Sequence, residues 1–398
     1  MAASSRASSP KYASPWGSSR TVLPPVQAGR SVAGFPRSLR LSSQPAPVRS
    51  SQRGHRVPSR CVPSRRRARD MRRSLHPRPE DRKEPLAPST PAGLSEGEPS
   101  FPTLPHRIQE VSMRAQQITD PITYHGEGPV WSEQWGGLRW VDMLAGDILT
   151  LTGDAGDAWD TVTRHHVASV AAAVRPRRGG GAVIGVEQGF ALEDSDGSIA
   201  TLSPVWASNA VRMNEGACDP DGRFYCGSMA YDQTPGAASL YRLDVDGRVD
   251  VVLDGVTISN GLDWSPDGSL AYYNDTPTGH VSVFDYDTAN GLTARRSFVQ
   301  IADGGQPDGL TVDAEGGVWV AVVGQGVIQR YRPDGRLDEV IEVPATKTTA
   351  CTFGGEHLDR LFITTSREDV DTDADPLAGA LFVAEVGVRG IPTRPFAG

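Results

Sequence analysis

Short runs of apolar residues, each introduced by a turn, recur along the chain from residue 120 onward. The runs are rich in Val, Ile, Leu, Tyr and Trp, and Gly, Asp and Pro bound them, as is typical of strands joined by tight turns. Turns such as DPDG and SPDG suit β-hairpins because Gly accepts a positive φ. The runs that follow the turns are LRWVD, GAVIGV, RFYCGSM, LAYYND, VWVAVV and RLFITTS. The pattern therefore predicts an all-β domain.

The turns repeat at a regular interval. They fall near residues 137, 180, 222, 268, 316 and 360, so that 42 to 48 residues separate one turn from the next. A β repeat of about 40–50 residues with several short strands is typical of a propeller blade. No amphipathic stretch long enough for crossover helices lies between the strands, which disfavours a parallel α/β sheet. We predict a six-bladed β-propeller over residues 114–395, closed by pairing of segment 114–122 with C-terminal strands.

The first quarter of the chain has a different composition. Residues 1–105 contain 17 Arg, 19 Ser and 17 Pro, and their 19 basic and 6 acidic residues give a net charge of +13. The total of −8 therefore combines a basic segment with an acidic domain. Since the segment shows no apolar periodicity, we expect residues 1–110 to form a disordered tail. Alternatively it is not translated, with Met113 or Met71 as the start, or it is an organelle-targeting segment.

Several function classes are disfavoured. The Arg-rich stretch RCVPSRRRARDMRR has no interleaved aromatic residues, so nucleic-acid binding is not expected. The sequence contains no run of 18 apolar residues, so no membrane span is expected. It contains no apolar stretch near residue 1, so no secretory signal is expected. None of the four Cys forms a C-x-x-C pair, and Cys218 and Cys226 are expected to be free, buried thiols. We expect a cytoplasmic protein, monomeric or homodimeric, unless the tail directs it to an organelle.

One polar position recurs at the same phase of four repeats. In three repeats an Asn or Asp stands eight residues before a turn Gly, and in the first repeat a Glu stands nine residues before Gly136. These residues are Glu127, Asn214, Asn260 and Asp308. The first strand of each propeller blade lines the central channel, so their side chains should converge at one mouth of it. In the second repeat the position is Ala172, and in the sixth it falls near Cys351 and Thr352.

Convergence of these oxygen-bearing side chains predicts a central metal site. Without a cation they would repel one another or stay unsatisfied, and all-oxygen ligands favour Ca²⁺, Mg²⁺ or Mn²⁺ over Zn²⁺. The alternative is that they are ordinary residues of strand starts, where Asn, Asp and Gly are common. Recurrence in four repeats favours the metal site.

Five motifs in order resemble those of the senescence marker protein/gluconolactonase/regucalcin-like family. They are GEGPVW, RMNEGACDPDGRFYCGSM, SNGLDWSPDG, QPDGLTVDAEGGVWVA and FGGEHLDRLFITTS. The resemblance covers about residues 115–395. It implies a six-bladed propeller with one divalent metal, Ca²⁺ first, with Zn²⁺, Mn²⁺ or Mg²⁺ as alternatives. It also implies hydrolysis of a small-molecule sugar-acid lactone.

The resemblance also implies roles for individual residues. The metal ligands would be Glu127, Asn260 and Asp308. The substrate would be bound by Arg212, Asn214 and Asp232, the last standing where animal members have Glu. Asp308, both a ligand and a carboxylate, is our candidate for the general base, with pure ligation as the alternative. Glu215 and His280 depart from the family pattern, which leaves their roles open.

Other polar residues suggest chemistry less strongly. His125 is expected to support the site or to pack, because no G-x-S-x-G motif supplies a nucleophile. His165 and His166 should point to opposite faces of a strand, which argues against a shared metal site. The acidic run 366–376 lacks the pattern of an EF-hand and is expected to be a solvated loop. Asp142 and Asp275 should lie at the pocket rim or in turns.

Three functions are therefore weighed. The leading hypothesis is a metal-dependent lactonase. The second is a non-catalytic calcium-binding propeller or interaction scaffold, and the third is a propeller with a different reaction, similar to strictosidine synthase-like proteins. Acidic residues gathered at the channel mouth, with Arg212 nearby, favour a small polyhydroxylated ligand.

Overall fold

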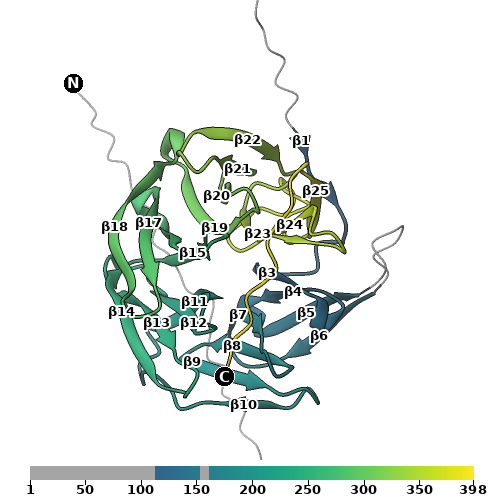
Figure 1. The fold of residues 1–398 in the computed structure, drawn as a ribbon. Coiled ribbons are helices and arrows are strands. Elements are labelled where there is room, and N and C mark those ends of the chain that lie inside the picture. The colour runs from purple at the N-terminus through teal and green to yellow at the C-terminus, as the bar shows by residue number, and fades with distance from the viewer. Residues whose placement is uncertain (1–112, 153–160) are drawn as a thin grey trace, which may run out of the picture. The chain divides into compact units, whose positions relative to one another are not determined.

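The hydrophobic repeats form the blades of a ring. The computed structural model describes residues 113–152 and 161–398, so the predicted tail lies outside the described residues. Within the described residues, six sheets surround a central channel, and the strands of each repeat pair with their chain neighbours in antiparallel order (Figure 1). The prediction of an all-β, six-bladed propeller is confirmed.

The strands of each blade follow one another from the channel outward. Blade one has β3 (Gly126–Ser132), β4 (Gly137–Asp142), β5 (Asp147–Thr152) and β6 (Thr161–His166). Blade two has β7 (Ala171–Pro176), β8 (Ala182–Val186), β9 (Gly189–Glu193) and β10 (Ile199–Thr201). Blade three has β11 (Val211–Cys218), β12 (Phe224–Ala230), β13 (Ala238–Leu243) and β14 (Val249–Val256).

The second half of the ring follows the same order. Blade four has β15 (Ser259–Trp264), β16 (Leu270–Asp275), β17 (His280–Asp287) and β18 (Gly291–Gln300). Blade five has β19 (Gln306–Val312), β20 (Val318–Val323), β21 (Val327–Tyr331) and β22 (Leu337–Glu342). Blade six has β23 (Thr348–Gly354), β24 (Arg360–Thr365) and β25 (Phe382–Glu385). The short 3₁₀ helices are η1 (Glu133–Trp135), η2 (Met143–Ala145), η3 (Thr276–Thr278) and η4 (Ala302–Gly304).

The second strands carry continuous apolar runs because neighbouring blades cover both of their faces. Every residue of β12 is buried, whereas the outermost strand β6 is mostly exposed. Aromatic rings fill the space between blades: Tyr225 of blade three meets Trp264 of blade four edge-on, with ring centroids 5.5 Å apart. The core is therefore divided among the blade interfaces, and the channel is left for polar side chains.

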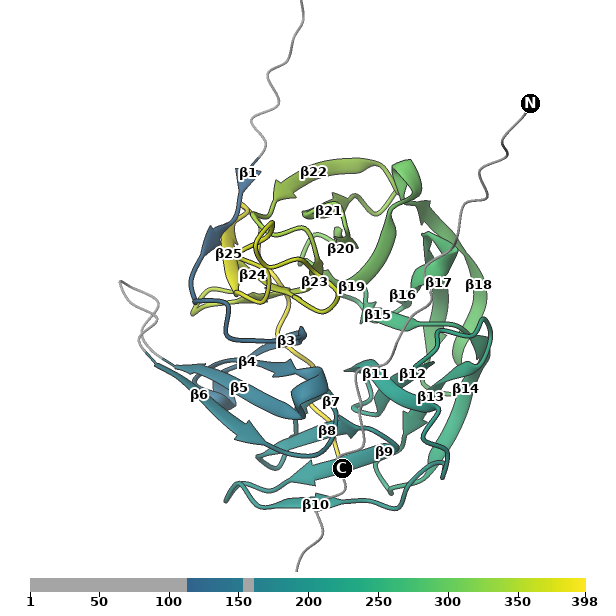
Figure 2. The ribbon, with the colours of Figure 1, turned by 180° about the vertical axis from the view of Figure 1, so that it is seen from behind.

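The segment before the first blade closes the ring, as predicted. Strand β2 (Gln116–Gln117) pairs antiparallel with β25 and completes the sheet of blade six. Strand β1 (Met113–Arg114) pairs parallel with β22, the outer strand of blade five (Figure 2). Both pairings cover strand edges that would otherwise expose unpaired backbone groups.

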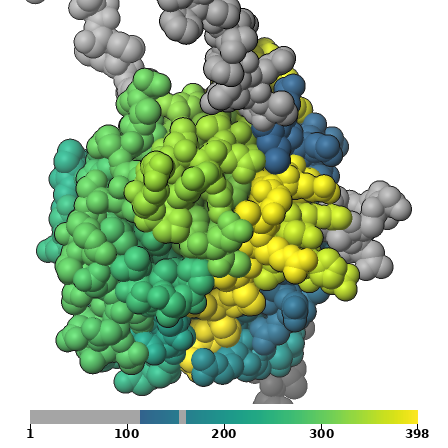
Figure 3. All heavy atoms as spheres, turned by 45° about the horizontal axis from the view of Figure 1, so that its top comes forward, coloured from purple at the N-terminus to yellow at the C-terminus, as the bar shows by residue number. Residues whose placement is uncertain are grey.

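A C-terminal strap, residues 389–398, was not predicted. It makes a hydrogen bond with each blade near the end of that blade's inner strand or the turn that follows. The blade partners are Trp131, Pro176, Gly222, Ser265, Ala314 and Leu358. Figure 3 shows the chain's yellow C-terminal part as a band across the surface. The strap therefore covers the channel end opposite to the starts of the inner strands.

The described residues contain no helix long and apolar enough to cross a membrane. Cys218, Cys226 and Cys351 are free and buried, as expected for the first two, and Cys61 lies outside the described residues. Burial raises the pKa of the Cys226 thiol to about 12, so it is a poor nucleophile.

Candidate metal and substrate site

The inner hairpin of every blade is interrupted by a β-bulge near the start of its first strand. The strand register shifts at this point in all six blades. A bulge re-aims a side chain. In five blades the first residue inside the shift is the candidate mouth residue: Ala172, Asn214, Asn260, Asp308 and Thr349. In blade one Glu127 is the last paired residue before the shift, and Gly128 follows it inside the shift. The polar positions found in the sequence therefore lie in the bulges of blades three to five and directly before the bulge of blade one.

The prediction for blade six was wrong by two to three residues. The bulge residue is Thr349 rather than Cys351 or Thr352. The positive-φ turn position is filled there by Leu358, with φ 52°, and not by Gly, so the turn was placed too late. The Thr349 hydroxyl donates to the Gly126 carbonyl over 2.6 Å, which fixes the backbone beside Glu127.

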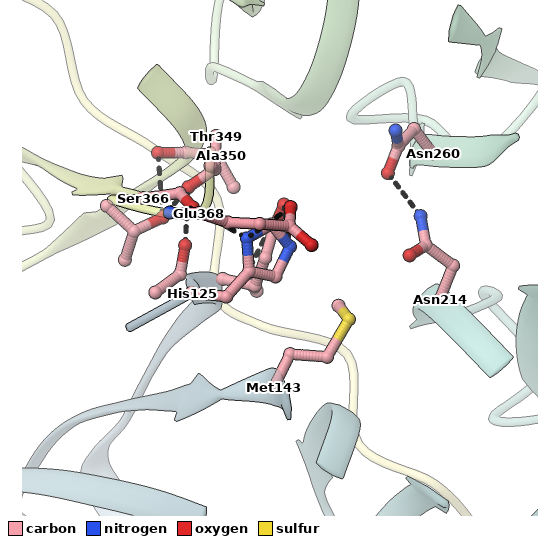
Figure 4. A network of polar contacts seen from close by, with 12 residues as sticks. His125, Met143, Asn214, Asn260, Thr349, Ala350, Ser366 and Glu368 are labelled. Atoms are coloured by element: carbon pink, nitrogen blue, oxygen red, sulfur yellow. Dashed lines mark hydrogen bonds and ion pairs between the residues drawn. The ribbon is translucent and has the colours of Figure 1, made fainter. Parts of the chain in front are cut away.

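Blades three and four share a chain of amide hydrogen bonds at the mouth. Arg212 Nη1 donates to Asn214 Oδ1 over 2.6 Å. Asn214 Nδ2 donates to Asn260 Oδ1 over 2.8 Å (Figure 4). Asn260 Nδ2 in turn donates to the Thr276 hydroxyl over 2.7 Å. The chain fixes both amides, because each amide oxygen accepts a hydrogen bond from the preceding side chain. It also places Arg212 next to Asn214, as the sequence spacing implied.

Two buried carboxylates complete this level of the channel. Glu127 is 3% exposed and Asp308 is 6% exposed. Burial, and then the negative charge of Asp308 and Glu215, raises the pKa of Glu127 well above its usual range. Burial and Glu215 do the same to the pKa of Asp308, whose buried Oδ1 has no hydrogen-bond partner among the described residues. A cation beside these groups would offset the repulsion between the buried carboxylates and would give Asp308 Oδ1 a partner.

His125 supports this arrangement from blade one. Its Nδ1 lies 2.7 Å from the Ser366 hydroxyl, and its Nε2 lies 4.0 Å from Glu127 Oε1 (Figure 4). Burial lowers the pKa of His125 to about 4, so the ring is neutral near pH 7. Ser366 is fully buried, which leaves it no access to a substrate. These contacts agree with the supporting role expected for His125.

Glu215 faces a different space. It lines an internal cavity of about 50 Å³ together with Arg175, Asp263 and Arg394 of the strap, further along the channel. Its Oε2 is buried without a hydrogen-bond partner among the described residues. The cavity is polar and has room for a few water molecules. Glu215 is thus placed behind the mouth and not in it.

Three of the remaining candidates lie outside the mouth. Asp232 follows β12, is exposed, and accepts a hydrogen bond from the Thr234 amide over 3.0 Å, so its substrate role stays a prediction. His280 opens β17 and approaches the Thr278 carbonyl. His166 pairs with Asp147 on the outer edge of blade one.

Asp142 and Asp275 anchor the entry of their own blades. Asp142 accepts a hydrogen bond from the His125 amide, and Asp275 accepts one from the Ile258 amide, each over 2.9 Å. Each amide lies two residues before a mouth residue, Glu127 or Asn260. Both Asp residues therefore fix the backbone that leads to the mouth residues. This agrees better with the turn role that was expected as one alternative than with a place on the pocket rim.

Sequence reasoning missed the contribution of blade six. The run 366–376 was expected to be a solvated loop, yet Ser366 contacts His125, and Glu368 is only partly exposed. Lys347 Nζ donates to Glu368 Oε2 over 3.1 Å. One signal was available: this run follows the second strand of its blade directly, as Met143 and Thr276 do in blades one and four.

Comparison with known proteins places this geometry in a family. The model of the SMP-30/gluconolactonase/LRE-like region matches residues 125–367. The chain belongs to this family. It is 36% identical to regucalcin of Danio rerio over 287 residues, which are 69% of this chain and 95% of that protein. It is 34% identical to the putative sugar lactone lactonase YvrE of Bacillus subtilis (strain 168), with the same coverage of both chains.

A solved structure of the family shares the fold. The calcium-binding protein regucalcin from Agrobacterium tumefaciens superposes with a TM-score of 0.66 at 27% identity, covering 72% of this chain and 97% of its own. The resemblance read from the five motifs is thereby confirmed.

Proposed function

We propose that this chain hydrolyses a sugar-acid lactone to the aldonic acid with the help of one divalent cation. The observation that supports this proposal most is Asp308, a buried carboxylate with an unpartnered oxygen, which lies at the same channel level as Glu127 and Asn260. The description of the family model, which names gluconolactonase, and the relative described as a putative sugar lactone lactonase point to the same class of reaction.

The side chains present fit a hard cation. Among the described residues no three His, Cys, Asp or Glu side chains converge on one point, so amide oxygens and water would have to complete the ligands. Glu127 and Asp308 would supply charge, and Asn260 Oδ1 keeps a second lone pair beside its bond from Asn214. Such a donor set suits Ca²⁺ best. When bound, the cation would polarise the lactone carbonyl and acidify a water molecule.

Side chains of the protein would transfer the proton and bind the substrate. Asp308 Oδ1 is free to accept a proton from the attacking water. Arg212 uses Nη1 for Asn214, Met143 and the backbone, while its Nε and Nη2 make no hydrogen bond within the described residues. Those groups would bind substrate oxygens. The ring C–O bond breaks, its oxygen takes a proton to become a hydroxyl, and the acid formed releases a proton near pH 7.

The alternative is a cation-binding protein without turnover. Such a protein would need the two carboxylates to bind the cation. It would not need Arg212 Nε and Nη2 to be free for a substrate. The two functions separate in one assay, since lactone hydrolysis releases acid that a pH indicator detects.

The test compares the native protein with Asp308→Asn. We expect the native protein to hydrolyse at least one lactone in a panel of aldonolactones with added Ca²⁺, and chelator to stop the reaction. Asp308→Asn should reduce kcat at least about 100-fold, since general-base catalysis typically contributes a factor of 10²–10⁴. Calorimetry should also show weaker Ca²⁺ binding, because one carboxylate is lost.

The control is Asp373→Asn, which removes an exposed carboxylate from the loop after β24. It should leave both the rate and the Ca²⁺ affinity unchanged. Ca²⁺ binding without hydrolysis of any lactone would support the non-catalytic alternative. Full activity of Asp308→Asn would exclude Asp308 as the base.

A further inference from the structure

Blades three and six lie opposite each other in the ring, and each brings charged groups to the same mouth. Blade three supplies Arg212, which is 4% exposed. Blade six supplies Glu368, three residues after the end of β24, with a side chain that is 27% exposed. Burial lowers the pKa of Arg212, and the negative charges of Glu368 and Glu127 act in the opposite direction. A ligand above the two carboxylates would thus lie between a cationic and an anionic side chain.

Glu368 is held in place by its neighbours. Lys347 Nζ donates to its Oε2 over 3.1 Å and to its backbone carbonyl over 2.9 Å. The same Oε2 lies 3.5 Å from His125 Nδ1, and the Glu368 amide donates to the Ser366 hydroxyl over 3.0 Å (Figure 4). A side chain fixed at its backbone and at one oxygen is ready to bind with little further loss of entropy.

The other carboxylate oxygen is available. Glu368 Oε1 accepts no hydrogen bond within the described residues, while Lys347 and His125 both contact Oε2. Burial raises the pKa of Glu368, but electrostatic interactions with His125, Lys347 and Arg212 outweigh burial and lower this pKa below its usual value. Near pH 7, where His125 is neutral, Lys347 and Arg212 provide the positive charge that keeps the carboxyl ionised. An ionised carboxylate accepts hydrogen bonds and donates none, so its natural ligand group is a hydroxyl.

We propose that Glu368 binds a hydroxyl group of the substrate, and that it thereby selects polyhydroxylated lactones over lactones without hydroxyl groups. The proposal rests on the proposed function and adds to it the wall of the site that recognises the sugar. A site built to bind a hydroxyl discriminates strongly against an analogue that lacks it, because the polar group of the protein is then left unpaired. Glu368 is a specificity residue in this scheme and takes no part in the proton transfer.

The experiment compares two lactones of the same ring size. Glucono-δ-lactone carries hydroxyl groups, and δ-valerolactone carries none. For Glu368→Ala we expect kcat/KM for glucono-δ-lactone to fall about ten- to a hundred-fold, chiefly through KM, as a charge-assisted hydrogen bond is lost. For δ-valerolactone kcat/KM should change less than about threefold. Glu368→Gln, which keeps an acceptor oxygen but loses the charge, should fall between the native protein and Glu368→Ala.

Two further measurements separate binding from structural support. The Ca²⁺ affinity and the melting temperature of Glu368→Ala should match those of the native protein, because the proposed ligands are unchanged. The matched control, Asp373→Asn, removes a carboxylate from the same loop and should behave as the native protein with both lactones.

Equal losses with both lactones, or weaker Ca²⁺ binding, would show that Glu368 only supports His125 and would overturn the proposal. So would an unchanged KM for glucono-δ-lactone. Failure of the native protein to hydrolyse any lactone would instead refute the proposed function, so the two failures are distinguishable.

Discussion

At the scale of single residues, two neighbouring positions of one bulge serve different spaces. Asn214 joins the amide chain at the channel mouth, whereas Glu215 lines the cavity behind it. Burial raises the pKa of Glu215 to about 7 even though Arg175 acts in the opposite direction. The carboxyl is therefore partly protonated at neutral pH. Its ionised form destabilises the folded state, because the charge is buried.

This burial predicts a pH-dependent stability that Glu215→Gln should remove. An unfolded Glu ionises near pH 4.5, whereas Glu215 in the folded protein keeps its proton up to about pH 7. The contribution of Glu215 to the free energy of unfolding is therefore fully present below pH 4.5 and is lost as pH rises through about 7. Between pH 5 and 8 the advantage of Glu215→Gln over the native protein should grow, by up to about 3 kcal/mol. Urea unfolding in chelator, repeated at each pH, measures this difference. A difference that does not change with pH would contradict the assignment.

The sequence predicted mouth residues wherever the repeat kept its turn Gly. Asn214, Asn260 and Asp308 precede a Gly of positive φ by eight residues, and Glu127 precedes one by nine, so counting back from the turn found them. Thr349 was missed because Leu358 replaces that Gly. Glu368 was missed because its surroundings depend on strand pairing. The β23–β24 hairpin brings Lys347 to it, and ring closure brings His125.

At the scale of elements, the blades were predictable and the strap was not. Each blade has its own periodic apolar pattern, but the strap sequence RGIPTRPFAG has no period. Its hydrogen bonds go to the ends of inner strands or the following turns in six different blades. Phe396 anchors it: the ring is 2% exposed and belongs to the core cluster of blades one to three. Nothing in the local sequence indicates where this ring packs.

The strap should therefore contribute to stability but not to turnover. Phe396→Ala is expected to lower the free energy of unfolding by about 3 kcal/mol, a typical cost of removing a buried Phe. The proposed site lies at the opposite end of the channel, so kcat/KM of the folded variant should stay within about threefold of the native value. Leu337→Ala, at a side chain that is 53% exposed, is the control and should cost less than about 0.5 kcal/mol.

A large loss of activity in folded Phe396→Ala would show that the strap and the mouth are coupled through the channel. An unfolding free energy equal to the native value would show that the strap is dispensable for the ring. Chemical denaturation and initial rates, measured on the same preparation, decide between these outcomes.

At the scale of the whole molecule, charge and topology divide the chain near Met113. The basic first segment accounts for +13 of the charge, and the rest carries −21. The first paired residue of the ring is Met113, which pairs with Ile341 in blade five. The sequence alone indicated this division, because the composition changes where the strand pattern begins. It could not show that β1 and β2 join two different blades, since two-residue strands carry no periodicity.

These pairings predict different results for two start points. A chain that starts at Met113 keeps β1 and β2 and should match the full chain in melting temperature and in lactone hydrolysis. A chain that starts at Ile118 loses both strands and the buried Ala115, and it exposes the edges of β22 and β25. Open edges promote aggregation, so the shorter chain should melt earlier and be less soluble. Thermal melts and centrifugation of matched preparations test both statements. Loss of soluble protein already at the Met113 start would mean that residues 1–112 contribute to folding, and equal behaviour of the two truncated chains would refute the closing role of β1 and β2.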